Sequence, residues 1–210
     1  PFLLYLRTLQ GNFRAMFSDS QVQCFLSTVA LAVLMAAGWL WLENGLVPIL
    51  VLRLASFNIV STITGTGYAT SDFSPWGSFA LPIFFFIMFI GGCAGTTTGG
   101  LKVIRIAIML KALWRELFLV VHPRAVRKLR LGAKVLDETL VRNVAVFFFI
   151  YIILFLTGAL VLLYLEPGWG LVDAMAASIA CLSNVGPGLG AVGPGASYAG
   201  LSSGTLSVLS

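Results

Sequence analysis

Two long apolar segments without charged side chains divide the chain. They cover residues 22–42 and 143–165, and each reaches the ~20 residues that a helix needs to cross the ~30 Å hydrocarbon core of a bilayer. A polar turn follows each segment, Glu43-Asn44-Gly45 in the first case and Glu166-Pro167-Gly168 in the second. We therefore predict two membrane-spanning helices, each followed by a turn.

Three further apolar segments are too short to cross a membrane as helices. They cover residues 48–63, 79–90 and 170–183. The first and the third each follow a predicted span and its turn, and each precedes a break in the apolar pattern. We predict that these two are re-entrant helices, which enter the membrane and let the chain return to the same side. A further helical pattern covers residues 101–119.

The breaks after the two re-entrant helices have the composition of an ion filter. Residues 64–67 are Thr-Gly-Thr-Gly, residues 183–186 are Ser-Asn-Val-Gly, and Gly186 follows Gly67 by 119 residues. Non-helical backbone at membrane depth survives only where protein buries it or water wets it, and strands with free carbonyl oxygens form cation selectivity filters. We predict a pore built from repeats, with the filter residues Thr64, Gly65, Thr66, Gly67, Ser183, Asn184, Val185 and Gly186.

A third break follows the apolar segment 79–90 and contains five Gly and three Thr residues. Such a sequence forms poor helix, and the preceding segment leaves it at membrane depth. We predict a gating loop beneath the filter, formed by Gly91, Gly92, Gly95, Thr96, Thr97, Thr98, Gly99 and Gly100. The alternative is a helix-packing surface made of small residues. Lys102 and Arg105 follow on one helical face, either as interfacial anchors or as cations that tune conduction near the gate.

Composition identifies the chain as an integral membrane protein. It has 210 residues, of which 59% are hydrophobic and 10% are charged, whereas soluble domains carry about 25% charged residues. The single His and the three widely spaced Cys residues form no metal, disulfide or nucleophile–base motif, so we expect no enzyme. The chain begins at Pro1 and stops at Ser210 as an apolar segment starts, so we expect a piece of a longer protein.

Basic and acidic residues are unevenly distributed along the chain, and this distribution predicts which side of the membrane each loop faces. Residues 105–142 hold nine Lys and Arg residues against three acidic residues, and basic loops face the cytoplasm. The breaks then approach from the outer side, where Glu43, Asp72, Glu166 and Asp173 make an acidic mouth; Asp72 and Asp173 could equally cap helices. We divide the chain into a lead-in (1–21), a first repeat (22–119), a basic cytoplasmic linker (120–142) and a second, truncated repeat (143–210).

Three motifs resemble one family of ion transporters. Residues 64–73, Thr-Gly-Thr-Gly-Tyr-Ala-Thr-Ser-Asp-Phe, resemble the third-repeat filter of the Trk/Ktr/HKT cation transporters. Residues 91–102 look like the Gly-rich break in the second helix of that repeat, and residues 184–190 resemble the fourth-repeat filter. The resemblance is strongest to the bacterial TrkH/TrkG-type potassium uptake subunits and covers nearly the whole chain.

The resemblance implies an all-α integral membrane fold of potassium-channel-like repeats, each ordered as span, pore helix, filter and span. It implies K⁺ as the transported ion, no cofactor in this chain, and a homodimer in the bacterial inner membrane. A cytosolic ring of TrkA-like regulatory subunits, with NAD or ATP bound in Rossmann domains, is expected to regulate it. The basic linker is a possible contact for that ring, through Arg124, Arg127, Lys128, Arg130 and Lys134.

Two alternatives use the same fold. One is a carrier coupled to Na⁺ or H⁺, and the other is a Na⁺-selective relative. Proton-coupled carriers often place acidic residues within their spans, and the predicted spans 22–42 and 143–165 hold none. The choice between K⁺ and Na⁺ depends on repeats one and two, which this sequence does not include.

Overall fold

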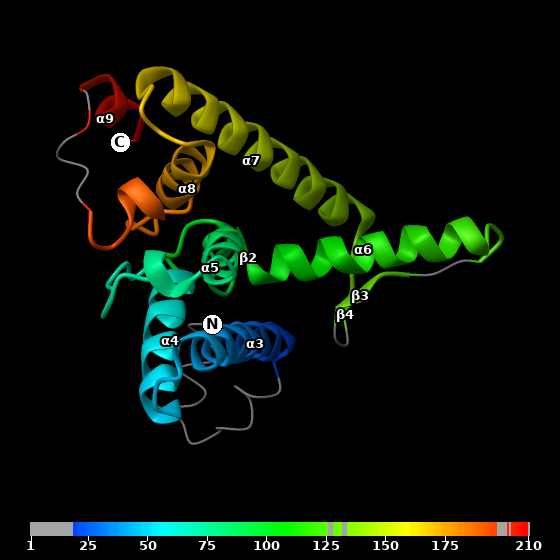
Figure 1. The fold of residues 1–210 in the computed structure, drawn as a ribbon. Helices are drawn as coiled ribbons and strands as arrows, with labels where there is room; N and C mark the ends of the chain where they lie inside the picture. The colour runs from blue at the N-terminus through cyan, green and yellow to red at the C-terminus, as the bar shows by residue number, and fades with distance from the viewer. Residues whose placement is uncertain (1–18, 126–127, 132–133, 197–200, 202, 210) are drawn as a thin grey trace.

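A computed structural model describes residues 19–125, 128–131, 134–196, 201 and 203–209. The chain is mostly helical in this part (Figure 1). The helices are α3 (Ser20–Asn44), α4 (Pro48–Ile63), α5 (Ala80–Phe89), α6 (Val103–Val121), α7 (Glu138–Leu165), α8 (Leu171–Leu182) and α9 (Ser203–Leu209), with 3₁₀ turns η1 (Ser74–Trp76) and η2 (Gly190–Val192). Most of the predicted lead-in, residues 1–18, lies outside the described residues.

The helices α3 and α7 are long and apolar enough to cross a membrane. Asp19 caps α3, because its carboxylate accepts hydrogen bonds from the amides of Gln21 and Val22 at 2.8 and 3.3 Å. Gly45 ends the helix with a left-handed φ of 58°, a conformation that glycine adopts at little cost. The helix predicted at residues 22–42 is therefore confirmed.

Helix α7 begins at Glu138, earlier than the predicted start at Asn143. The reason lies outside the apolar run: Arg115 of α6 forms an ion pair with Glu138, and Val141 is buried with Ile108 in a small apolar cluster. Tertiary contacts thus extend the helix through polar residues that do not continue the apolar pattern.

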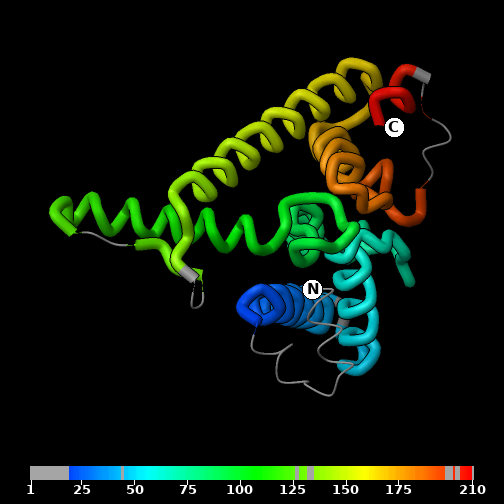
Figure 2. Tube along the Cα trace, turned by 180° about the vertical axis from the view of Figure 1, so that it is seen from behind, coloured from blue at the N-terminus to red at the C-terminus, as the bar shows by residue number. Residues whose placement is uncertain are grey.

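The short helices fall where the sequence places them. Helix α4 has the predicted bounds, and α5 and α8 lie within the predicted segments 79–90 and 170–183. Helix α3 packs against α4 and α7 packs against α8. In Figures 1 and 2 these two pairs lie on opposite sides of α5 and the start of α6.

Two short strand pairs correct the prediction of a purely helical fold. β1 (Ile90–Gly91) pairs in parallel with β2 (Leu101–Lys102), and β3 (Arg130–Leu131) pairs antiparallel with β4 (Lys134–Val135). Parallel pairing normally needs a long crossover. Here the Gly/Thr-rich loop between β1 and β2 closes on itself and brings both strands together.

The main core surrounds α5, between the two helix pairs. Phe84 is fully buried, and its ring stacks on Phe73 with centroids 4.0 Å apart. Trp76 packs edge-on against the same ring at 5.6 Å, and its carbonyl accepts a 3.0 Å hydrogen bond from the indole nitrogen of Trp39 in α3. The segment that follows α4 is therefore attached to both α3 and α5.

Candidate functional site

Two loops with the same backbone geometry follow the short helices α4 and α8. We call residues 64–67 the α4 loop and residues 183–186 the α8 loop. Thr64 begins the first at φ −86° and ψ −4°, and Ser183 begins the second at φ −90° and ψ −3°. Their amides donate to Val60 and Ile179 at 3.0 and 2.9 Å, so each residue still closes a helical turn.

The two loops then leave their helices by the same turn. Gly65 and Asn184 both take left-handed φ values, 65° and 53°, which glycine adopts freely and asparagine tolerates better than most residues. The next amides reach back five residues, Thr66 to Ser61 at 2.9 Å and Val185 to Ala180 at 2.8 Å. The left-handed φ recurs at the final glycine of each loop, with 77° and 97°.

This turn directs the amides and the carbonyls of the loops differently. The amides of residues 64–67 and 183–185 bond back to their helices. Within the part of the chain that the structure describes, the carbonyl oxygens of residues 64–67 and 183–185 accept no hydrogen bond. These carbonyl oxygens therefore have no partner among the described residues.

The loops lie against each other, backbone to backbone. A Cβ atom added to Gly67 would lie 2.5 Å from the Val185 carbonyl oxygen and 3.4 Å from the ring of Pro187. A Cβ atom added to Gly65 would lie 3.4 Å from the Asn184 carbonyl oxygen. The structure therefore brings together the two groups of residues that the sequence predicts as a filter.

The Gly/Thr loop, residues 91–100, connects α5 to α6 and is closed by its own side chains. The hydroxyl of Thr98 accepts from the Gly92 amide at 3.0 Å and lies 2.8 Å from the hydroxyl of Thr96. The Thr96 hydroxyl donates to the Cys93 carbonyl at 2.7 Å. Lys102 reaches back from the start of α6 and donates to the Thr96 carbonyl at 2.6 Å.

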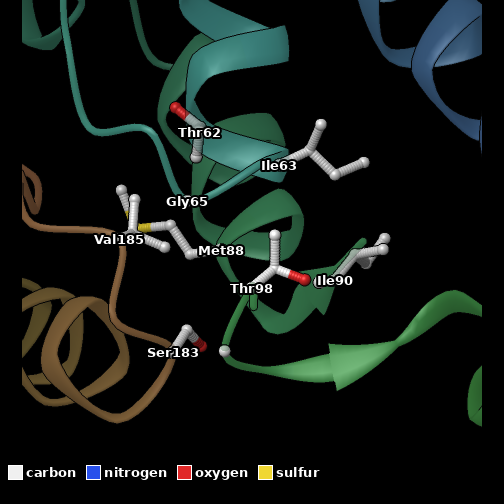
Figure 3. Close-up of a pocket in the computed structure, with 10 residues that line it drawn as sticks. Thr62, Ile63, Gly65, Met88, Ile90, Thr98, Ser183 and Val185 are labelled. Atoms are coloured by element: carbon white, nitrogen blue, oxygen red, sulfur yellow. The ribbon is translucent and has the colours of Figure 1, made fainter. Parts of the chain in front are cut away.

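The Gly/Thr loop also contacts the α8 loop. Gly99 lies so close to the Ser183 carbonyl oxygen that an added Cβ would overlap it, and a Cβ on Gly100 would lie 3.3 Å from the Ser183 hydroxyl. A narrow pocket lies where the three loops meet (Figure 3). Its lining residues are Thr62, Ile63, Gly65, Met88, Ile90, Gly91, Thr98, Gly99, Ser183 and Val185.

The chain after each loop is tied back to its helix by a side chain. Asn58 of α4 donates to the Thr70 hydroxyl and accepts from the Thr70 amide, both at 3.1 Å. Asp173 of α8 accepts from the Ala191 amide at 2.9 Å and from the Gly170 amide at 3.2 Å. Sequence analysis missed Asn58, although a buried amide in an apolar helix is a detectable feature.

The acidic residues predicted near the mouth make local structural contacts. Asp173 accepts a 3.2 Å hydrogen bond from the Gly170 amide at the start of α8, and Asp72 accepts a 2.8 Å hydrogen bond from the Ser74 amide at the start of η1. Asp173 thus contacts the first turn of its helix, in line with the capping role left open for it, whereas Asp72 bonds within the turn before η1, which has no side-chain cap.

The predicted basic residues occupy separate places. Arg105 lies over the Phe147 ring of α7, 3.9 Å from its centroid, while Lys102 bonds to the Gly/Thr loop. In the linker, the described residues Arg124, Lys128 and Arg130 are exposed. Arg127 and the side chain of Lys134 lie outside the described part.

Comparison with known proteins gives consistent matches over nearly the whole chain. The sequence profile of the TrkH cation transport protein family matches residues 16–208. The Trk system potassium uptake protein TrkI of Halomonas elongata is 36% identical over 203 residues, which cover 96% of this chain and 40% of that protein. The corresponding protein TrkH of Escherichia coli is 35% identical over 191 residues, which cover 90% of this chain and 39% of that protein.

The fold matches as well. The crystal structure of the potassium transporter TrkH from Vibrio parahaemolyticus superposes with a TM-score of 0.90 and 32% sequence identity, over 99% of this chain and 44% of that chain. This chain therefore spans less than half the length of the relatives that it matches. On the extent of these matches, the chain belongs to the TrkH family of cation transport proteins.

Proposed function

We propose that this chain forms part of the pore of a potassium uptake subunit, and that K⁺ passes along the carbonyl oxygens of the α4 and α8 loops. One observation carries the proposal: two loops of matching backbone geometry lie side by side with their amides turned back into the helices. The relatives named above as potassium uptake proteins and a potassium transporter support the choice of ion.

Backbone oxygens suit this task for a physical reason. A filter must replace the water shell of K⁺, yet bind the ion weakly enough to release it. Carbonyl dipoles meet both needs, whereas a carboxylate in the path would hold the cation strongly. Helices α4 and α8 end at their loops, so the partial negative charge of each C-terminus adds a favourable potential for a cation.

The Gly/Thr loop is proposed to be the gate. It lies against the Ser183 carbonyl, so an ion leaving the α8 loop has to pass it. Its stretch of glycines gives little resistance to movement. Lys102 donates a hydrogen bond to the Thr96 carbonyl. When the Gly/Thr loop opens, either this bond breaks or the Lys102 side chain moves with the loop.

The orientation and the partners follow from charge and from the family. We place the basic linker in the cytoplasm and the α4 and α8 loops toward the outside of a bacterial inner membrane. The complete protein is proposed to be a homodimer that binds a cytosolic ring of nucleotide-binding subunits. This chain itself is proposed to hold no cofactor, with NAD or ATP on the regulatory subunits and K⁺ as the cargo.

The test is ion selectivity in the complete protein reconstituted in liposomes. Gly67→Ser places a side chain against the Val185 carbonyl and forces a left-handed residue to carry a Cβ, so the K⁺ to Na⁺ flux ratio should fall at least several-fold. Gly168→Ser is the matched control, because an added Cβ there would have no neighbour within 4 Å. Unchanged selectivity in Gly67→Ser, or no K⁺ flux in the unmodified protein, would contradict the proposal.

A further inference from the structure

A buried hydrogen bond joins helix α7 to the α8 loop. The hydroxyl of Tyr151 lies 2.6 Å from the hydroxyl of Ser183. Both residues are buried, with 5% and 3% of their surfaces exposed. Because buried polar groups are costly when left without a partner, this pair fixes the position of one side chain relative to the other.

Ser183 is the point where three parts of the site meet. Its amide closes the last turn of α8 on Ile179, its carbonyl oxygen lies against Gly99, and its hydroxyl faces Gly100. Movement of Ser183 would therefore move a proposed ion ligand and the contact surface of the Gly/Thr loop together.

The matching position of the α4 loop is held in a different way. The Thr64 hydroxyl donates to the Val60 carbonyl at 2.7 Å and lies 2.7 Å from the Thr66 hydroxyl. These partners belong to its own helix and loop. The Ser183 hydroxyl of the α8 loop instead bonds to a neighbouring helix, α7. The two loops therefore have the same backbone geometry but different side-chain partners at this position.

We propose that Tyr151 is a positioning residue for ion selection, which acts by fixing the Ser183 carbonyl through the hydroxyl–hydroxyl bond. The inference rests on the proposed function of the two loops. Discrimination between K⁺ and Na⁺ depends on the placement and freedom of the coordinating carbonyls. Without the bond, Ser183 gains freedom, and its carbonyl can follow the smaller Na⁺ ion.

The test is Tyr151→Phe in the complete protein. The ring of Tyr151 packs near Phe89 and Phe147, with centroids 6.2 and 6.3 Å away, and phenylalanine keeps these contacts while it removes only the hydroxyl. Tyr164→Phe is the matched control, because Tyr164 lies in the same helix and is 85% exposed. The expected result is a fall of about threefold or more in the K⁺ to Na⁺ permeability ratio of Tyr151→Phe, from a carbonyl cage that is less fixed.

The readout that decides is the ratio, because a merely structural role would lower expression and melting temperature and leave the ratio alone. If the complete protein selects K⁺ but Tyr151→Phe selects equally well, the positioning role is wrong and the proposed function stands. If the unmodified protein does not select K⁺, both are wrong.

A double-mutant cycle tests the mechanism through the other partner. Ser183→Ala removes the second hydroxyl and should lower the ratio by a similar factor, even if Tyr151→Phe does not assemble. Adding Tyr151→Phe to Ser183→Ala should have little further effect, because the bond is already absent. Full selectivity in Ser183→Ala, or additive losses in the double variant, would overturn the inference.

Discussion

Close backbone contacts decide which residues the site tolerates. Gly67 and Gly186 have similar left-handed φ values, yet only Gly67 faces another backbone, at the Val185 carbonyl; a Cβ on Gly186 would have no neighbour within 4 Å. Left-handed φ costs a non-glycine residue roughly 1–2 kcal/mol, a cost common to both sites. Of these two glycines, only Gly67 has a close backbone contact. Gly99 of the Gly/Thr loop has a similar contact, with the Ser183 carbonyl oxygen.

At Gly99 this contact predicts a change in gating. An alanine there would place its Cβ on the Ser183 carbonyl oxygen, and the neighbour is backbone, so the Gly/Thr loop has to move away from the α8 loop. We expect Gly99→Ala in the complete protein to raise the rate of K⁺ flux in liposomes. Gly168→Ala, which meets no atom within 4 Å, should conduct like the unmodified protein, and an unchanged or lower flux in Gly99→Ala would argue against a gate.

The packing between α7 and α8 depends on one glycine within a long helix. Gly158 of α7 lies against Ser178 of α8, and an added Cβ would be 2.6 Å from the Ser178 hydroxyl oxygen. That hydroxyl donates to the Phe155 carbonyl at 2.9 Å, so it is not free to turn away without losing its partner. Small residues allow membrane helices to approach each other closely, and this contact holds α8 beside the helix that carries Tyr151.

Gly158→Ala should therefore destabilise the protein although alanine is the better helix former. Overpacking of a tight interface typically costs about 1–3 kcal/mol, which over most of that range exceeds the gain of roughly 1 kcal/mol in helix propensity. The matched change is Gly38→Ala in α3, where an added Cβ would have no neighbour within 4 Å. We expect a lower melting temperature for Gly158→Ala in detergent and no decrease for Gly38→Ala. Equal melting temperatures for both variants would show that the Gly158–Ser178 contact does not contribute to stability.

Element boundaries were predictable where one local rule determines them. The bounds of α4 follow from Pro48, which suits the first helical turn, and from the Thr/Gly run that ends the apolar segment. The α4 and α8 loops were located because breaks in helical pattern are unusual at membrane depth. The early start of α7 was not predictable in this way, because it depends on contacts from α6.

Contacts between distant segments were beyond the sequence pattern. The sequence shows that Asn58 is an amide in an apolar helix, but it does not show that Asn58 or Tyr151 holds a loop in place, since their partners lie 12 and 32 residues away. The parallel pair β1–β2 was missed for the same reason: it forms only when the Gly/Thr loop closes. Sequence reasoning therefore found the loops, while the residues that position them required the fold.

At the scale of the whole molecule, charge gathers on the linker between α6 and α7. Lys128 and Arg130 are exposed there, and together with Lys111, Trp114, Arg115 and Leu129 they line an open cavity. Arg115 is already engaged, because it pairs with Glu116 at 2.9 Å and with Glu138. Among the described residues, the exposed charges of Arg124, Lys128 and Arg130 are therefore available to a partner, and that of Arg115 is not.

This distribution predicts how a cytosolic regulatory ring would respond to charge reversal. Each exposed ion pair contributes about 0.2–1 kcal/mol, and reversal adds repulsion, so Lys128→Glu with Arg130→Glu should weaken binding by about tenfold, or ~1.4 kcal/mol. The loss of affinity should be smaller at high salt because exposed charges are screened.

The control is Lys128→Arg with Arg130→Lys, which keeps the charge. The measurement is the dissociation constant of the purified ring for the complete protein in nanodiscs, at low and high salt. Equal affinity of the reversed and the control variants at low salt would remove this surface from the interface and leave the linker with a purely topological role.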